Sequence, residues 1–571
     1  MELIGDVCQN EPEVEPEVEP EVCQRAKPTK HTTLTYEPKR YKNYILYLDP
    51  DGVTVNFDQI NPRKKDITKH KQLATYKVVR RIENYLTLRA TMIMGPEKRI
   101  KCCVVKKRQQ TIRIPRFAIY ELLNDKYGLQ YYSIKSRLPS GQTLSNAKFH
   151  GELRHNQKII QQHMLANIYT DARLKHGSAG CILNLEAGQG KSYLAANLIS
   201  CFKKRTAIVI HSSALLEQWE KVIRSCYPNA TIGYYHSKKK QLGDIMILII
   251  NSVLSKEFKF KTKLPKQKGK RAQYRTETFT PGEFFAQFGF MIYDECHLYC
   301  SKVFGKAFSI AQTPYVLGLS ATPDEHALKF DKLVWWGLGP VLDAKLLSGY
   351  QQTDNQFTGE VRRIMFYGEP KYTKIIRNQI TDMVSIAETI TMLCQDEKRT
   401  RLIIWCVRQC RALNLNTFVF ADRREYLEKI RSYLLMEKHN LDEEDPNKLI
   451  HVMTTDAEYT RLVGGSSQEE MARAEKQSTI VLTTYQFMGT GKSIPRMNAL
   501  VLATPRKSKM AQYIKRIFRL GSDQSIQRVI YDLTDMKVTV KNQWSVRKKY
   551  YTSQNFTITE QKIKASQVAK L

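Results

Sequence analysis

The chain has 571 residues, 42% of them hydrophobic and 10% aromatic, so it can build several cores and is not a wholly disordered polymer. It carries 90 Lys and Arg against 56 Asp and Glu, a net charge of +34 that favours a polyanionic partner. No apolar run approaches the roughly 20 residues of a membrane-spanning helix.

The N-terminal segment differs in composition from the rest of the chain. Residues 11–22 are three tandem copies of Glu-Pro-Glu-Val, which cannot bury enough apolar area to offset the entropy of ordering, so we predict disorder over residues 1–30. Residues 1–24 hold eight acids and no Lys or Arg, and removing them leaves +42 on the remainder. This acidic start lacks the features of a secretory leader, so we expect a soluble intracellular protein.

Residues 31–150 have the texture of a small mixed accessory domain. Short β-like runs are broken by turn signals such as the Asp-Pro-Asp-Gly of residues 49–52, and the runs include Tyr44–Leu48, Thr87–Met94 and Cys102–Val105. The segment is basic and has no catalytic signature. We therefore predict an N-terminal accessory domain.

Buried strands alternating with helices then predict two doubly wound α/β domains, at residues 151–340 and 385–540. Their apolar runs are short and lack polar alternation, which is typical of parallel strands covered on both faces. A connecting segment is expected at 341–384 and a basic tail at 541–571. The predicted strands are Cys181–Leu185, Ala207–Ile210, Ile245–Ile250, Phe290–Tyr293, Tyr315–Leu319, Thr417–Ala421, Thr479–Thr483, Leu500–Ala503 and Val529–Tyr531.

The strongest local signal is a glycine-rich turn between a predicted strand and a predicted helix. Such a turn lets backbone N–H groups surround phosphates at a helix N-terminus, with Lys191 reaching the β and γ phosphates and Ser192 binding Mg²⁺. We therefore predict an ATP-binding loop formed by Glu186, Ala187, Gly188, Gln189, Gly190, Lys191 and Ser192.

A pair of acids ends the predicted strand Phe290–Tyr293. Carboxylates at the carboxyl end of a strand in the same sheet can hold Mg²⁺ and orient a water molecule. We assign Asp294 to the metal and Glu295 to the general base, with Lys191 as the third catalytic residue of this domain.

The acids belong to the sequence Asp-Glu-Cys-His of residues 294–297, which resembles the DExH box of superfamily 2 helicases, and the other motifs of that family occur in order. The resemblance implies two RecA-like domains, ATP and Mg²⁺. It also implies that Gln157 reads adenine and that Ile208–Trp219 is motif Ia. Residues implied to touch nucleic acid or to couple it to the ATP state are Asn251, Ser252, Ser320, Ala321 and Thr322.

In the second α/β domain the resemblance extends to motifs V and VI. Motif V supplies Thr484, Gln486 and Gly491 as coupling or nucleic-acid contacts, and motif VI supplies Arg516 and Arg519 as arginine fingers that stabilise charge on the γ-phosphoryl group. Two departures weaken the match: Lys515 replaces the usual Gly of motif VI, and Ser493 replaces the usual Asp of motif V.

A basic stretch, residues 256–275, has nine Lys or Arg, one acid and the aromatics Phe258, Phe260 and Tyr274. Basic and aromatic residues together suit contact with a nucleic-acid strand through phosphates and stacking. A solvated surface loop fits the same composition equally well, so both interpretations stay open.

Residues 111–117, 334–340 and 418–430 resemble the poxvirus-type transcript-release helicases and their relatives in large nucleocytoplasmic DNA viruses. The resemblance implies 3′-to-5′ unwinding of DNA, with RNA as the alternative substrate, and a role with the viral transcription machinery. The implied location is the viral factory of the host cytoplasm, with packaging in the virion a further expectation. Two alternatives remain, a translocase that does not separate strands and a catalytically idle nucleic-acid scaffold.

Overall fold

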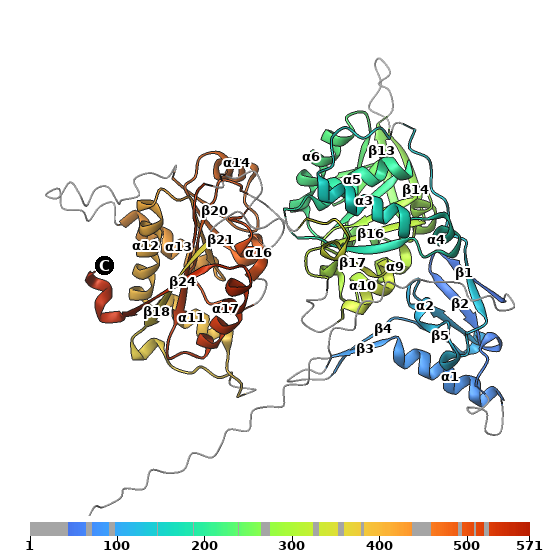
Figure 1. The fold of residues 1–571 in the computed structure, drawn as a ribbon, viewed down its shortest axis with the longest axis horizontal. Coiled ribbons are helices and arrows are strands. Elements are labelled where there is room, and N and C mark those ends of the chain that lie inside the picture. Colours follow the sequence, from blue (N-terminus) through green and yellow to red (C-terminus); the bar gives the residue numbers. More distant parts are fainter. Residues whose placement is uncertain are drawn as a thin grey trace, which may run out of the picture. The chain divides into compact units, whose positions relative to one another are not determined.

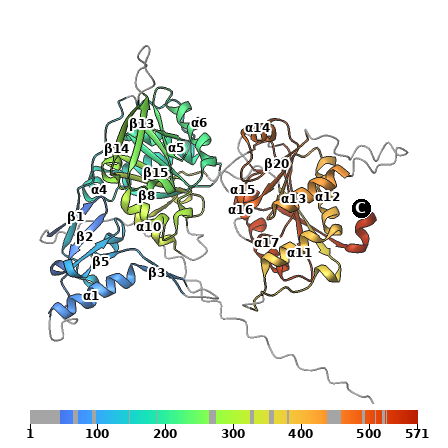
Figure 2. The same ribbon diagram turned by 180° about the vertical axis from the view of Figure 1, so that it is seen from behind.

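The computed structural model describes residues 44–63, 71–90, 97–145, 147–186, 188–237, 239–263, 274–323, 330–351, 359–378, 382–436, 458–488, 494–507, 510–518, 523 and 525–570. The acidic repeat for which we predict disorder lies outside these residues. Within them the chain folds into an N-terminal domain and two α/β domains (Figures 1 and 2). No helix among the described residues is long and apolar enough to span a bilayer.

The N-terminal domain is a mixed α and β unit. Its described strands form a five-stranded sheet in the order β5-β6-β2-β1-β7 and a separate β3-β4 ribbon. Strand β1 pairs in parallel with β7 and antiparallel with β2, which makes the sheet mixed as expected. The elements are β1 (Tyr44–Asp49), β2 (Gly52–Asn56), α1 (Lys71–Tyr85), β3 (Thr87–Ala90), β4 (Lys98–Lys101), β5 (Val104–Lys106), β6 (Thr111–Ile114), α2 (Ala118–Leu122) and β7 (Tyr132–Ser136).

The N-terminal domain is fastened to the first α/β domain by a buried arginine. Arg116 is 1% exposed and donates to three backbone oxygens, those of Gly177 at 2.7 Å, Thr313 at 2.6 Å and Pro314 at 2.8 Å. Trp336 adds a 3.1 Å hydrogen bond from its indole to Glu121. One apolar cluster includes side chains of both domains, so they share a core.

The first α/β domain carries a sheet whose described strands run in the order β11-β10-β12-β9-β15-β16-β8-β17, parallel except for β11. Its elements are α3 (His155–Asn167), α4 (Asp171–His176), β8 (Gly180–Asn184), α5 (Lys191–Phe202), β9 (Thr206–Ile210), α6 (Leu216–Cys226), β10 (Ile232–His236), β11 (Lys239–Gln241), β12 (Ile245–Ile249), α7 (Ile250–Val253), β13 (Phe258–Lys263), β14 (Tyr274–Phe279), α8 (Pro281–Phe285), β15 (Phe290–Tyr293), α9 (Ala307–Ile310), β16 (Tyr315–Ser320), α10 (Asp331–Leu338) and β17 (Val341–Asp343).

Alternate residues of these strands enter two separate cores, one on each face of the sheet. In β15, for example, Phe290 and Ile292 pack with helices α3, α5 and α6. Met291 and Tyr293 pack on the opposite face with α8, α9, α10, the β13-β14 hairpin and the N-terminal domain. This coverage of both faces explains the continuous apolar runs in the sequence.

The second α/β domain has a fully parallel sheet, with its described strands in the order β20-β21-β19-β22-β23-β18-β24. Helices α12 and α13 cover one face, and α15, α16 and α17 cover the other. The elements are β18 (Gly359–Tyr367), α11 (Ile386–Gln395), α12 (Glu397–Ala412), β19 (Thr417–Ala421), α13 (Arg424–Met436), β20 (Tyr459–Leu462), α14 (Gln468–Lys476), β21 (Ile480–Thr484), α15 (Tyr485–Met488), β22 (Ala499–Leu502), α16 (Met510–Ile514), β23 (Arg528–Asp535), α17 (Gln543–Ser553) and β24 (Thr557–Lys564).

Two predictions about the borders of this domain are wrong. The segment 341–384, expected to be a connection, contributes β17 to the first sheet and β18 to the second. The expected tail 541–571 contributes α17 and β24, and β24 pairs with β18 over its whole length. The sequence of β24 is polar because this strand is the exposed edge of the sheet. The two arginines of β18 have acidic partners, Glu360 for Arg362 and Glu560 for Arg363.

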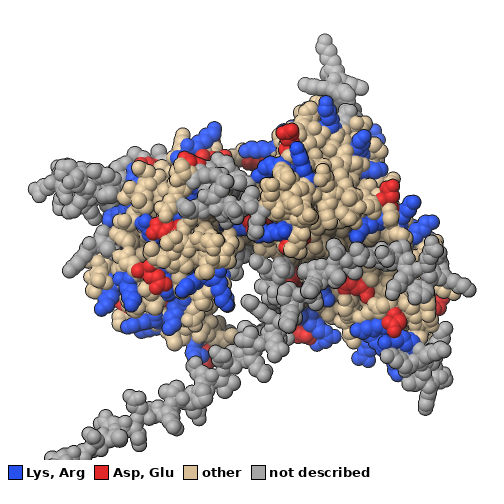
Figure 3. All heavy atoms as spheres, viewed as in Figure 1, with Lys and Arg blue, Asp and Glu red and all other residues tan. Residues whose placement is uncertain are grey.

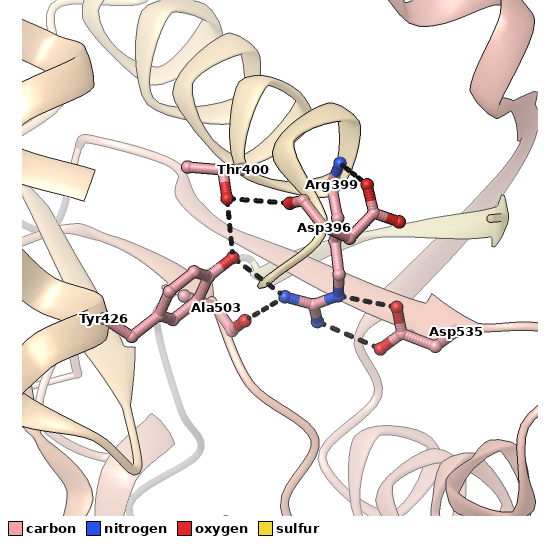
Figure 4. A network of polar contacts seen from close by, with 6 residues as sticks. All are labelled: Asp396, Arg399, Thr400, Tyr426, Ala503 and Asp535. Carbon is pink, nitrogen blue, oxygen red and sulfur yellow. Dashed lines mark hydrogen bonds and ion pairs between the residues drawn. The ribbon is translucent and has the colours of Figure 1, made fainter. Parts of the chain in front are cut away.

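A buried polar network ties the helices of the second α/β domain to its sheet (Figure 4). Arg399 of α12 is fully buried and forms two hydrogen bonds with Asp535 at the end of β23, of 2.6 and 2.9 Å. Its remaining donors reach the Ala503 carbonyl at 2.6 Å and the Tyr426 hydroxyl of α13 at 3.2 Å. Asp396 caps α12 by accepting from the Arg399 backbone N–H. The buried charge is therefore paired, and each of its three guanidinium nitrogens has a hydrogen-bond partner.

Candidate ATP site

The predicted phosphate-binding loop lies between the carboxyl end of β8 and the start of α5, where nucleotides bind in open α/β sheets. Gly188 and Gly190 have φ of 86° and 80°, in the left-handed region that favours glycine. A Cβ atom on Gly190 would lie 2.5 Å from Gln157 Nε2 and 2.5 Å from Arg154 Nη2. Any other residue at position 190 would therefore strain the backbone and displace these two side chains.

Lys191 is the first residue of α5 and is 9% exposed. Its ammonium donates to the Leu185 carbonyl at 3.0 Å, which holds it over the loop. Ser192 follows in the first turn and is partly exposed, and Ala187 lies outside the described residues. Glu186 is bound by Lys345 at 2.6 Å, and this pairing lowers the pKa of Glu186 although burial opposes ionisation.

Gln157, expected to read adenine, is bound to the chain at both ends of its amide. Its Oε1 accepts from the Arg154 backbone N–H at 2.9 Å, which caps α3, and its Nε2 donates to the Gly190 carbonyl at 3.1 Å. With 3% exposure it links α3 to the phosphate-binding loop. The structure thus places Gln157 beside the phosphate-binding loop, and its role in reading adenine stays a prediction.

The paired acids end β15, which is separated from β8 by the single strand β16. Asp294 is 5% exposed, and burial followed by the neighbouring Glu295 carboxylate raises its pKa to about 6. Burial also opposes ionisation of Glu295, but the charges of Lys191 and His297 hold its pKa below the ordinary value. Lys191 therefore acts on both acids, which places the loop lysine and the acids in one site.

Glu295 has φ of 47°, a backbone conformation that a non-glycine residue seldom adopts. Residues held in such conformations concentrate at functional sites, because only a well-determined surrounding structure can keep them there. Tyr299 supports the turn by donating from its hydroxyl to the Asp294 carbonyl at 2.8 Å. The turn therefore changes the direction in which the Glu295 side chain points after the end of β15.

The DExH box is linked to the next motif by hydrogen bonds. His297 lies with its Nδ1 2.9 Å from Ser320 Oγ and 3.4 Å from Glu295 Oε2. Ser320 is fully buried, and its Oγ also accepts from the Thr322 backbone N–H at 3.0 Å. His297, which lies beside the Glu295 carboxylate, is thus joined by hydrogen bonds to Ser320 and Thr322 of motif III, and Ala321 lies between these two residues.

The other residues expected to contact nucleic acid lie on short helices at the carboxyl ends of strands. Asn251 and Ser252 are in α7 directly after β12, with Asn251 exposed and Ser252 partly so. Thr484 ends β21 and accepts a hydrogen bond from the Phe487 backbone N–H, while Gln486 is exposed in α15. Gly491 lies outside the described residues.

The two expected arginine fingers follow α16. Arg516 is 5% exposed, and its backbone N–H donates to the Tyr513 carbonyl at 3.1 Å. Arg519 lies outside the described residues. The role of both as fingers stays a prediction.

The basic stretch 256–275 forms the β13-β14 hairpin, whose tip at 264–273 lies outside the described residues. Phe258 and Phe260 are buried, with the Phe258 ring stacked on Phe284 at 4.0 Å between centroids. These two aromatics are core residues, so the interpretation that stacks them on bases is wrong for Phe258 and Phe260. Lys259 and Lys261 alternate with them and are exposed.

The contact between Trp219 and Asp294 was not predicted from the sequence. Trp219, expected only as the end of motif Ia, is fully buried and donates from its indole to Asp294 Oδ2 at 2.8 Å. The two residues are 75 positions apart, and the one sequence signal was a large aromatic with a polar N–H in an otherwise charged helix.

The residues present fit a magnesium nucleotide. The glycine cradle leaves the backbone open to phosphate oxygens, and Lys191 supplies a buried cation. Ser192 and Asp294 offer the oxygen donors that Mg²⁺ prefers. Among the described residues, no group of three or more His, Cys, Asp and Glu side chains is placed to hold a metal ion.

Residues 151–325 match the family model of the type III restriction enzyme, res subunit. A protein of African swine fever virus (isolate Pig/Kenya/KEN-50/1950), named as an ATP-dependent RNA helicase, is 26% identical over 420 residues, covering 70% of this chain and 73% of the relative. An Acanthamoeba polyphaga mimivirus protein with a similar name is 23% identical over 420 residues, covering 73% of this chain and 70% of the relative. This chain is an ATP-dependent helicase.

Two solved structures match this helicase at low sequence identity. The crystal structure of T4 UvsW has a TM-score of 0.32 at 16% identity, covering 86% of this chain and 96% of that one. S. cerevisiae Dbp5 bound to RNA and ADP BeF3 has a TM-score of 0.42 at 14% identity, covering 72% and 90%. The two parallel sheets of the helicase are the RecA-like domains that its sequence predicts.

Proposed function

We propose that this helicase belongs to superfamily 2 and that it unwinds DNA during viral transcription, in the release or elongation of transcripts. The observation that carries the proposal is the joint placement of Asp294 and Glu295 at the end of β15, with both acids in the electrostatic field of Lys191. ATP hydrolysis requires this combination of a phosphate-binding cation and two carboxylates with different tasks.

The proposed roles follow from the geometry. Lys191 and the loop backbone bind phosphates, and Ser192 with Asp294 holds Mg²⁺, which neutralises phosphate oxygens when bound. Glu295, whose pKa is lowered, is ionised at neutral pH and orients the attacking water. The hydrogen bond between His297 and Ser320 then relates the state of this site to motif III. Arg516 and Arg519 are the proposed fingers.

The nucleic-acid partner is supported by charge. Lys and Arg side chains gather over the N-terminal domain and over the second RecA-like domain (Figure 3). In the first of these they include the consecutive exposed residues Lys106, Lys107 and Arg108, and in the second Lys548 and Lys549 of α17. Such surfaces bind phosphates through counterion release, whatever the sugar.

The viral setting is supported by relatives from large DNA viruses, which include an Invertebrate iridescent virus 6 protein named as a helicase, 22% identical over 422 residues, covering 71% of this chain and 82% of the relative. The names of the African swine fever virus and mimivirus relatives specify RNA. DNA is our proposal on the resemblance to transcript-release helicases, and the host cytoplasm is the proposed place of action.

The central experiment measures ATP hydrolysis with and without nucleic acid for the native protein, Lys191→Ala and Glu295→Gln. Both variants should lose the stimulated activity, because one lacks the phosphate-binding cation and the other lacks the base. Lys158→Ala, an exposed lysine on α3, is the matched control and should behave as the native protein does. Equal rates in all four proteins would refute the enzymatic role of this site.

A strand-displacement assay then tests the substrate. Partial duplexes of DNA and of RNA with 3′ or 5′ tails are compared, and we expect displacement of DNA from the 3′-tailed substrate. Displacement of RNA duplexes alone would replace the proposed substrate.

The match to a restriction-type motor subunit favours a second candidate, an ATP-driven translocase on double-stranded DNA. A translocase would displace a third strand from a triplex while leaving partial duplexes intact. Triplex displacement combined with no loss of strand from any partial duplex would favour this candidate over unwinding.

A further inference from the structure

Asp294 is restrained at each of its polar atoms by other parts of the first RecA-like domain. Its backbone N–H donates to the Val209 carbonyl of β9 at 2.9 Å, and its carbonyl accepts from the Tyr299 hydroxyl at 2.8 Å. Its Oδ1 accepts from the Glu295 backbone N–H at 3.1 Å, and its Oδ2 accepts from Trp219 Nε1 at 2.8 Å. Trp219 thus donates to this carboxylate from a side chain.

The indole bond differs from the other three because it comes from a helix outside the turn. Trp219 lies in α6, which packs against α5, the helix that begins with Lys191 and Ser192. Helix α6 therefore packs against α5, which carries the proposed hydroxyl ligand Ser192. It also donates a hydrogen bond to the proposed carboxylate ligand Asp294. A fully buried indole in this packed core has little freedom to turn, so it fixes the direction of the carboxylate.

A hydrogen bond to one oxygen also determines which lone pairs of the carboxylate remain available. Each carboxylate oxygen has about two acceptor positions, so Asp294 Oδ2 keeps a second lone pair after it accepts from the indole. A rotated carboxylate would present its oxygens in a different direction. An indole N–H carries no charge and cannot accept a bond, so it orients the carboxylate without competing with it for a cation.

We infer that Trp219 is a positioning residue that orients the Asp294 carboxylate for Mg²⁺. The geometry of the metal site then depends on the position of helix α6. The inference rests on the proposed function in one respect, that Asp294 is a magnesium ligand. Groups that orient a metal ligand commonly change metal affinity or activity about 10- to 100-fold when they are removed. Trp219 should belong to this class although it touches neither nucleotide nor metal.

The test is Trp219→Phe, which keeps an aromatic ring in the core and removes the N–H donor. Trp336→Phe is the matched control, because Trp336 is also buried and also donates its indole N–H to a carboxylate, Glu121, outside the ATP site. We expect the Mg²⁺ concentration for half-maximal ATP hydrolysis to rise about 10-fold in Trp219→Phe and to stay unchanged in Trp336→Phe. An unchanged Mg²⁺ dependence in Trp219→Phe, with hydrolysis intact in the native protein, overturns the inference and leaves the proposed function standing.

Tryptophan emission gives a second readout that does not need turnover. Mg²⁺ is titrated into the full chain with ATPγS present, and the emission should change in the native protein and in Trp336→Phe but not in Trp219→Phe. The same change in all three proteins overturns the inference. If Trp219→Phe unfolds, β-(3-benzothienyl)alanine at position 219 preserves the ring shape without the N–H, and the Mg²⁺ dependence of that protein decides the question in the same way.

Discussion

Replacing Arg399 by methionine removes the cation at the centre of the second RecA-like domain and leaves its neighbours in place. Arg399 is fully buried, and its partner Asp535 is 2% exposed (Figure 4). The substitution removes both guanidinium hydrogen bonds of the Asp535 carboxylate. It also removes the hydrogen bond that the Ala503 carbonyl accepts from Arg399. Methionine fills most of the side-chain volume, so the change is mainly electrostatic.

The size of the effect follows from the burial of both charges. Breaking a buried ion pair from one side commonly costs about 3–5 kcal/mol, because the remaining charge is uncompensated. For a domain of roughly 150–250 residues, 1 kcal/mol shifts Tm by about 2–4 °C. We therefore expect the transition of the second RecA-like domain to fall by roughly 6–20 °C. Removing both charges with Arg399→Met and Asp535→Leu should recover part of this loss, since well-packed apolar residues can replace a buried pair.

Differential scanning calorimetry of the full chain measures these transitions. Arg377→Met is the control in the same domain, because the Arg377–Asp382 pair is exposed at 55% and 88% and should contribute little. A transition of the Arg399→Met protein that coincides with that of the control would refute the reasoning that the buried network stabilises this domain.

Four further outcomes are expected. Gly190→Ala should weaken nucleotide binding, measured by calorimetric titration with ATPγS, because a Cβ would lie 2.5 Å from Gln157 Nε2 and the φ is 80°. Arg116→Lys should destabilise the joined N-terminal and first RecA-like domains nearly as much as Arg116→Met in denaturant unfolding, since one ammonium cannot reach three backbone carbonyls in fork geometry. Burial raises the pKa of Asp294 from 3.8 to about 6, so protonated Asp294 stabilises the metal-free fold fully below pH 3.8, and this contribution is lost as the pH rises through 6. Unfolding measured in EDTA should therefore show a fall in the free energy of unfolding over this pH range. The Asp294→Asn protein should show a smaller fall over the same range. Ser320→Ala should lower the number of base pairs displaced per ATP hydrolysed, because it removes the hydroxyl between His297 and Thr322.

Local patterns in the sequence were sufficient for the fold class and for most of the nucleotide site. The loop containing Lys191 is written in consecutive residues, and its strand and helix neighbours are strongly patterned, so their arrangement follows from short-range rules. The acids Asp294 and Glu295 were found for the same reason, since an apolar strand points directly to its carboxyl end.

Contacts between distant segments were decided by the tertiary structure alone. Strand β24 is polar in sequence and becomes a strand because the edge formed by β18 offers it a full set of backbone partners. Phe258 and Phe260 alternate with lysines in a way that suits either an exposed or a half-buried strand, and packing against Phe284 makes them core residues.

The sequence by itself determined that this protein has two doubly wound domains and a nucleotide-binding loop, because backbone propensity and hydrophobic periodicity act over a few residues. Only the tertiary structure joined Trp219 to Asp294 and Arg399 to Asp535, across 75 and 136 positions. A buried polar group must find a partner wherever the fold brings one, and no short-range pattern records which partner that is.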